Sequence, residues 1–172
     1  MKKKIIIKEI LSYVLLIGIV LIIKYYVVTP IKVNGDSMNP TLEDGDYMLL
    51  NEIGFYLNGV NRFDIVVVNY NDSKLIKRVI GLPGDYIEYK ASKLYVNGEV
   101  VEENFHHYVT EDFNLENMGY DKIPEGYYLV LGDNRTNSKD SRTIGLISKK
   151  QIMGKTNFTI YPFSKFGKVK SK

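Results

Sequence analysis

Residues 74–85 read Lys74-Leu75-Ile76-Lys77-Arg78-Val79-Ile80-Gly81-Leu82-Pro83-Gly84-Asp85, an apolar run with two central cations that stops at a Pro-Gly-Asp turn. In a strand over residues 75–80, Lys77 and Arg78 point to opposite faces of the sheet. Apolar neighbours flank Lys77 on its own face, so its ammonium can be partly desolvated, which lowers the lysine pKa from ~10.4. The pattern predicts a strand with an amine that can accept a proton. The alternative is an edge-strand lysine that reaches water.

Short β-branched or aromatic runs continue on both sides of this stretch, and turn sequences rich in Gly, Asp, Asn and Pro separate them. We expect strands at residues 47–50, 65–70, 75–80, 86–89, 93–96, 127–131 and 156–161. Residues 102–126 are acidic and weakly periodic, so we expect a long, polar, solvated insertion there, without an assigned function. The body is therefore expected to be all β.

The N-terminus carries a different pattern. Residues 10–23 contain no charged residue, and the apolar stretch reaches Val28 if Lys24 bends its ammonium toward the lipid headgroups. A helix over residues 10–28 would be roughly 28 Å long, close to the ~30 Å thickness of the hydrocarbon core. We expect a transmembrane anchor at residues 10–28, after a cytoplasmic N-terminus at residues 1–9 and before an extracytoplasmic catalytic domain at residues 29–172.

A cleaved export signal is the alternative reading of this segment, because lysines followed by an apolar run match its first two regions. Residues 24–30, which follow the run, lack the small residues of a cleavage site, so a retained anchor is favoured. Positive charge ahead of a span stays in the cytoplasm, and four lysines precede this one: Lys2, Lys3, Lys4 and Lys8. Tyr25 and Tyr26 suit the opposite interface.

Length and composition exclude several classes of protein. A chain of 172 residues is one domain with a small appendage. It has no cysteine and two histidines, so cysteine-ligated metals are excluded, a zinc site is disfavoured, and no cofactor is expected. The net charge is +3, but residues 1–28 hold five lysines and one Glu, which leaves a body with a net charge of −1. We therefore expect no nucleic-acid partner.

Two further segments carry residues suited to chemistry. In Asn34-Gly35-Asp36-Ser37-Met38-Asn39-Pro40-Thr41, a serine between flexible Gly35 and rigid Pro40 can be held on a turn, where its hydroxyl attacks and its N–H binds an oxyanion. A serine that only bonds its own turn is the alternative. Residues 132–142 follow an apolar run and are dense in short polar groups, with Asp140 and Arg142 able to pair. A solvated turn could also be this polar.

These three segments, in this order, resemble the motifs of bacterial type I signal peptidases. The matching residues are Gly35-Asp36-Ser37-Met38 with Pro40-Thr41, then residues 77–85, then Gly132-Asp133-Asn134-Arg135 with Ser138, Asp140, Ser141 and Arg142. The resemblance extends from the anchor to about Tyr161, and the single span and short body are similar to the compact forms of Gram-positive bacteria.

The resemblance implies a mostly β, partly open barrel-like catalytic body on a single N-terminal transmembrane helix. It implies a membrane-bound serine endopeptidase that removes signal peptides from exported preproteins after small residues. Ser37 would be the nucleophile and Lys77 the general base. Such a Ser-Lys pair is a known variant of the Ser-His-Asp catalytic triad. The implied partners are signal-peptide-bearing preproteins and the lipid bilayer, and we expect a monomer.

By the same resemblance, Ser138 would orient the Lys77 amine, while Asp140 and Arg142 would form a supporting ion pair. The Ser37 N–H would supply part of the oxyanion hole. Some family members have a hydroxyl donor where this chain has Gly35, so its hole must rely on backbone, water or another group. A lost donor of this kind can cost ~3 kcal/mol.

Three other classes of protein compete with this interpretation. Self-cleaving Ser/Lys repressors carry a DNA-binding domain, for which there is no room before Ser37. An inactive, membrane-tethered β module that binds exported peptides or pilus subunits should have lost Ser37 or Lys77, and both are present. A Ser–His hydrolase would need His106 or His107, adjacent histidines that we expect to be solvated.

Overall fold

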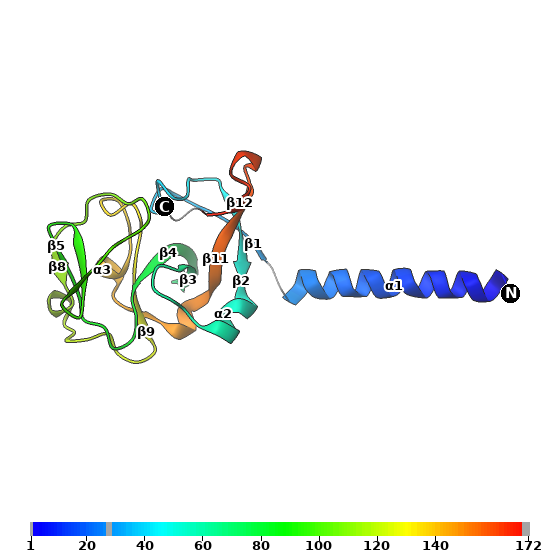
Figure 1. The fold of residues 1–172 in the computed structure, drawn as a ribbon, viewed down its shortest axis with the longest axis horizontal. Helices are drawn as coiled ribbons and strands as arrows, with labels where there is room; N and C mark the ends of the chain where they lie inside the picture. The colour runs from blue at the N-terminus through cyan, green and yellow to red at the C-terminus, as the bar shows by residue number, and fades with distance from the viewer. Residues whose placement is uncertain (1, 27–28, 170–172) are drawn as a thin grey trace.

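The computed structural model describes residues 2–26 and 29–169. It begins with helix α1 (Lys2–Tyr26), which extends from one side of a β body (Figure 1). Within the described residues, we find no helix that combines the length and the apolar character needed to cross a bilayer. The expected anchor ends at Val27 and Val28, which lie outside the described residues, and the transmembrane helix stays a prediction.

The body contains two antiparallel sheets. The larger follows the order β1-β2-β11-β3-β4-β9-β10, with β12 paired to β11. Its strands are β1 (Thr29–Lys32), β2 (Tyr47–Asn51), β3 (Ile65–Tyr70), β4 (Ser73–Gly81), β9 (Tyr127–Leu131), β10 (Ile147–Ser148), β11 (Ile152–Tyr161) and β12 (Gly167–Lys168). The smaller has the order β7-β6-β5-β8 and comprises β5 (Ile87–Lys90), β6 (Lys93–Val96), β7 (Glu99–Val101) and β8 (Phe113–Asn114).

Short helices join these strands. They are α2 (Glu52–Asn58), α3 (Ser141–Ile144) and the 3₁₀ turns η1 (Glu116–Met118), η2 (Lys149–Gln151) and η3 (Phe163–Lys165). The expectation of a mostly β body is therefore confirmed. In the larger sheet the strand order runs from β1 at one end to β10 at the other, and these two strands do not pair with each other to close the sheet in the described part of the chain.

The interior strand β4 determines the environment of Lys77. It pairs with β3 on one side and with β9 on the other, so Lys77 is not an edge-strand lysine. Val79, which shares the Lys77 face, packs in a cluster with Val66 and Val130 from the two neighbouring strands. The Lys77 side chain is thus enclosed by the residues that hold the sheet together, and it is 2% exposed.

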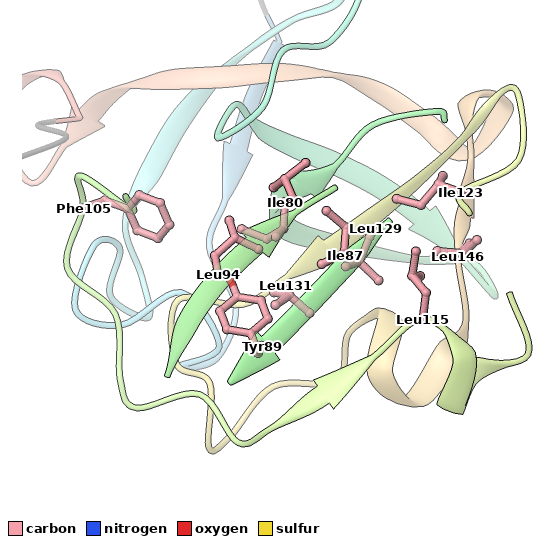
Figure 2. Close-up of a cluster of buried hydrophobic side chains, with 11 residues drawn as sticks. Ile80, Ile87, Tyr89, Leu94, Phe105, Leu115, Ile123, Leu129, Leu131 and Leu146 are labelled. Atoms are coloured by element: carbon pink, nitrogen blue, oxygen red, sulfur yellow. The ribbon is translucent and has the colours of Figure 1, made fainter. Parts of the chain in front are cut away.

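A second cluster fills the space between the two sheets. It joins Ile80, Leu129 and Leu131 of the larger sheet to Ile87 and Leu94 of the smaller one (Figure 2). Each of these side chains is almost fully buried. Burial of apolar area on this scale stabilises the contact of the sheets by roughly 25 cal/mol per Å², so the smaller sheet is fixed against the end of β4.

The insertion (residues 102–126) corrects one of our expectations. It has little regular structure, but it is not simply solvated, because Phe105, Leu115 and Ile123 are buried in the cluster between the sheets (Figure 2). These apolar residues are spaced too irregularly to give a strand or helix period, so the pattern did not reveal their burial. His106 is exposed as expected, whereas the His107 side chain is 17% exposed and contacts Glu103.

Candidate active site

Ser37 lies in a tight turn that follows β1. The Asn39 amide donates to the Asp36 carbonyl at 3.0 Å, and the Leu42 amide donates to the Met38 carbonyl at 2.9 Å. Met38 is buried in the core, while Ser37 is only partly buried. The chain is therefore anchored directly beside a serine whose hydroxyl has a defined direction, as a nucleophile requires.

Gly35, two residues ahead of Ser37, has a φ of +80°. Its N–H donates to Asp44 Oδ1 at 2.7 Å, which holds the peptide in this conformation. Glycine adopts a positive φ without the steric cost that a side chain brings. A serine or threonine at this position would be strained, so the missing hydroxyl donor follows from the local backbone.

Lys77 meets Ser37 although 40 residues separate them in the sequence. Its Nζ donates to Ser37 Oγ at 2.6 Å and to the Ile76 carbonyl at 3.0 Å. Burial lowers the pKa of the Lys77 ammonium from 10.5 to about 8, against the opposing attraction of Asp140 and Asp133. A sizeable fraction of the amine is thus neutral near pH 8, and the neutral form can accept the serine proton across the same short distance.

Asp140 and Arg142 form the expected ion pair. Arg142 donates from Nε to Asp140 Oδ1 at 2.9 Å and from Nη2 to Asp140 Oδ2 at 2.8 Å. The Asp140 side chain is fully buried, caps α3 and also accepts the Gly132 amide at 3.0 Å. The pair therefore fixes the loop after β9, and its carboxylate is one of the two that act on the Lys77 amine.

Ser138 differs from our expectation in one respect. Its Oγ is buried and has no hydrogen-bond partner in the described part of the chain, so the expected bond to Lys77 is not present. Ser138 does lie beside residues 36–42, the nucleophile turn, which carries the candidate nucleophile Ser37. A Cβ added to Gly132 would collide with both Ser138 Oγ and the Ser37 carbonyl oxygen. Gly132 is thus the point at which the turn and the loop after β9 meet.

Asn134 holds these two segments together. Its backbone N–H donates to the Ser37 carbonyl at 3.0 Å, and its side-chain Nδ2 donates to the Asp36 carbonyl at 3.1 Å. Both acceptors belong to the nucleophile turn, so the loop after β9 fixes the turn without using the Ser37 hydroxyl. The sequence motif contained Asn134, but nothing in it indicated this contact.

A buried ion pair beside the site was not predicted from the sequence. Arg78 donates from Nε and Nη2 to the two carboxylate oxygens of Asp133, at 2.8 and 2.5 Å. Thr41 Oγ1 donates to the same carboxylate at 2.5 Å, and Arg78 Nη1 donates to the Phe63 carbonyl at 3.0 Å. The neighbouring Lys77 and Arg78 thus reach separate sets of partners, as side chains on opposite faces must. The Asp-Asn-Arg of the third motif was the one available signal for this pair.

Comparison with known proteins gives concordant matches. The family model described as "Signal peptidase, peptidase S26" matches residues 6–161. Signal peptidase IB of Staphylococcus aureus (strain COL) is 42% identical, and the alignment covers 92% of this chain and 93% of that protein. Signal peptidase I S of Bacillus subtilis (strain 168) is 40% identical, and the alignment covers 97% of this chain and 95% of that protein.

A solved structure is similar as well. The crystal structure of a signal peptidase I from Enterococcus faecalis V583 superposes with a TM-score of 0.53 at 36% sequence identity. The match covers 56% of this chain and 95% of that chain.

Proposed function

Since the chain belongs to the signal peptidase family, peptidase S26, we propose that it cleaves signal peptides from exported preproteins with Ser37 as nucleophile and Lys77 as general base. The observation that carries this proposal is the 2.6 Å separation of Lys77 Nζ and Ser37 Oγ, made by a lysine that is almost fully buried. Burial favours the neutral amine, and only the neutral amine can act as the base.

In the proposed reaction, the Lys77 amine accepts the Ser37 proton as Oγ attacks the scissile carbonyl. The Ser37 N–H stabilises the oxyanion of the tetrahedral intermediate, and backbone or water supplies the second donor because Gly35 has no hydroxyl. The Lys77 ammonium then protonates the leaving amine. Water, activated by the same amine, hydrolyses the acyl-enzyme and restores the Ser37 hydroxyl.

Three residues of the third motif have supporting roles in this proposal. The buried Asp140 carboxylate, held by Arg142, stabilises the Lys77 ammonium when it forms. Ser138 orients the amine once its hydroxyl, which makes no bond to Lys77 in this structure, turns toward Nζ. This role is supported by the position of Ser138 against Gly132, beside the Ser37 carbonyl, and by its buried hydroxyl, which is unpaired among the described residues.

The proposal includes a place at the membrane. Residues 10–28 serve as the anchor, residues 1–9 lie in the cytoplasm, and the catalytic domain at residues 29–172 lies outside as a monomer. Support comes from the charge-free stretch at residues 10–23 and from the lysines ahead of it. An anchor would hold the site close to the bilayer, where preproteins emerge.

The test is a preprotein cleavage assay with the full chain purified in detergent. Wild-type protein should cut after a small residue, as identified by mass spectrometry of both products. Ser37→Ala and Lys77→Ala should each abolish the cut while leaving the far-ultraviolet circular dichroism unchanged. Full cleavage by the Lys77→Ala protein would exclude Lys77 as the base, and full cleavage by Ser37→Ala would exclude the serine mechanism.

A further inference from the structure

One segment of the insertion touches all three sequence motifs, although the sequence alone indicated no function for it. This segment, the strap, comprises residues 103–110. It lies in the chain between β7 and β8 of the smaller sheet and contains the buried residues Phe105 and Thr110. Phe105 lies at the edge of the cluster between the sheets, on a loop without regular structure (Figure 2).

The strap binds the third motif through a buried ion pair. Arg135 Nη2 donates to Glu103 Oε1 at 2.5 Å, and the two side chains are 0% and 5% exposed. Arg135 Nη1 donates to Thr110 Oγ1 at 2.6 Å and to the Tyr89 hydroxyl at 3.0 Å. Both ends of the strap, Glu103 and Thr110, therefore hold one guanidinium.

That guanidinium also holds the main chain of the active site. Arg135 Nε donates to the Gly132 carbonyl at 3.0 Å, while the Gly132 amide donates to Asp140 at 3.0 Å. Gly132 is the residue against which the Ser37 carbonyl and Ser138 lie. Glu103 is thus two contacts away from the atoms that position the nucleophile: Glu103 fixes Arg135, and Arg135 fixes Gly132.

The strap reaches the other two motifs as well. Arg78 Cζ lies 3.9 Å from the centroid of the Phe105 ring, in cation–π geometry. Arg78 directly follows Lys77 in the sequence, so this contact reaches the second motif. The Tyr108 hydroxyl donates to Oδ1 of Asn39 at 3.2 Å, and Asn39 lies two residues after Ser37 in the first motif. The Tyr108 amide donates to the Asp133 carbonyl at 3.0 Å, so one tyrosine connects the nucleophile turn with the third motif.

We propose that the strap is a positioning element for the Ser37 and Lys77 pair and that Glu103 is its principal positioning residue. The inference rests on the proposed function. Without the Glu103 carboxylate, the buried Arg135 charge loses its principal partner, and such a charge draws in water or shifts toward another acceptor. A shift of Arg135 moves the Gly132 carbonyl, and with it the contact to the Ser37 backbone. A displacement of one ångström at a reacting group is enough to cost up to about 100-fold in rate.

The test compares Glu103→Gln with Glu102→Gln in the preprotein cleavage assay, using the full chain in detergent. The glutamine keeps the size of the side chain and one acceptor oxygen, and it removes the charge. Glu102 is the adjacent acid and is exposed, so Glu102→Gln is the matched control for loss of one negative charge from the insertion. Ser37→Ala and wild-type protein are measured in parallel.

We expect Glu103→Gln to lower kcat by about tenfold or more with KM within twofold of wild type, because the defect concerns alignment of the pair and not substrate binding. Glu102→Gln should match the wild type in both constants. Rates are taken well below the thermal midpoint of each variant, so that loss of folded protein does not imitate a loss of kcat. A Glu103→Gln protein with wild-type kcat, or one in which KM alone changes, would overturn the proposal.

A second variant covers the case in which Glu103→Gln does not fold. The Tyr108 side chain is 45% exposed, so Tyr108→Phe removes the hydroxyl bond to Asn39 with little risk to the fold. We expect a two- to fivefold lower kcat at unchanged KM, and a wild-type kcat would overturn the proposal in that case. If wild-type protein does not cleave, or if Ser37→Ala cleaves fully, the proposed function fails and the inference fails with it. If those two behave as expected, the Glu103 and Tyr108 variants alone decide the inference.

Discussion

The Lys77 amine combines two properties that oppose each other. Burial makes it a base by lowering its pKa to about 8, and the same burial makes its charged form unfavourable in the fold. Asp140 and Asp133 attract the ammonium but do not offset the desolvation. The residue that carries the proposed chemistry is therefore also a place where the fold gives up stability.

The first prediction concerns the pH dependence of cleavage. In the proposed mechanism the neutral amine is the reactive form. Because the Lys77 pKa is lowered to about 8, kcat/KM should fall about tenfold per pH unit below pH 8 and level off above it. The measurement is the initial rate of preprotein cleavage between about pH 6 and 9.5, with circular dichroism at each pH as a control for folding. A rate that stays constant down to about pH 6 would contradict a lysine base.

The second prediction concerns stability. The unfolded chain keeps Lys77 protonated up to about pH 10.5, while the folded chain does so only below about pH 8. Folding at pH 7 must therefore bear a cost of up to about 3 kcal/mol, which disappears as the pH rises toward 10.5. Lys77→Met keeps the length of the side chain without the charge, so it should be inactive and should unfold at a higher temperature than wild type.

The check is thermal unfolding of both proteins at pH 7 and at pH 10. The stability gained by Lys77→Met should be clearly smaller at pH 10, where the wild-type amine is mostly neutral in the fold and partly neutral in the unfolded chain. An equal gain at the two pH values would mean that packing, and not the lysine charge, is responsible.

At the scale of elements, the site depends on a close approach between the nucleophile turn and the loop after β9. Gly132 has no Cβ at the point where Ser37 and Ser138 come together, and two Asn134 bonds hold the turn there. The Gly132 φ is not in the left-handed region, so the need for glycine here is one of space. The glycine is thus required by packing between two elements.

This requirement gives the third prediction. Gly132→Ala should reduce kcat by about 100-fold with far-ultraviolet circular dichroism like that of wild type, because the new methyl group pushes the Ser37 turn away from the loop. Gly18→Ala is the control, since a Cβ there has nothing within 4 Å. Cleavage at the wild-type rate by Gly132→Ala would show that the turn and the loop do not need this contact.

The same scale explains which elements the sequence could predict. Strands β3, β6 and β9 begin and end where we expected them, because their apolar runs stop at turn residues. Strand β11 starts at Ile152, four residues before the expected start at residue 156, because Gly154 interrupts the apolar pattern. The two-residue strands β8, β10 and β12 have no pattern of their own, and pairing with a neighbour alone defines them.

The candidate site, like the strands, could be predicted from the sequence only in part. The segments that contain Ser37 and Lys77 were recognisable from the sequence because their order along the chain is specific, and the catalytic roles of the two residues stay a proposal. The partners that fix them were not, because Asp133 is 55 residues from Arg78 and Glu103 is 32 residues from Arg135. The first pairing depends on how β4 lies beside β9, and the second on how the insertion folds against the loop after β9. No local pattern reports either.

At the scale of the whole molecule, the remaining prediction concerns orientation. The lysines lie ahead of the apolar stretch at residues 10–23, and the positive end of a span stays in the cytoplasm. The body, with a net charge of −1, should therefore lie outside. A site outside the membrane can meet a signal peptide only after the precursor has begun to cross, so the direction of insertion decides whether the proposed chemistry can serve export.

The measurement uses intact spheroplasts that produce the full chain with an epitope tag at each end. Protease added from outside should remove the C-terminal tag and leave a short membrane-bound fragment that carries the N-terminal tag. A cytoplasmic marker protein, intact before lysis and digested after it, is the control for closed membranes. A body that survives the protease until the membrane is lysed would reverse the orientation. A body that leaves the membrane in alkaline carbonate would instead exclude the anchor at residues 10–28, because that treatment releases proteins held by charge alone and retains those held by a buried apolar helix.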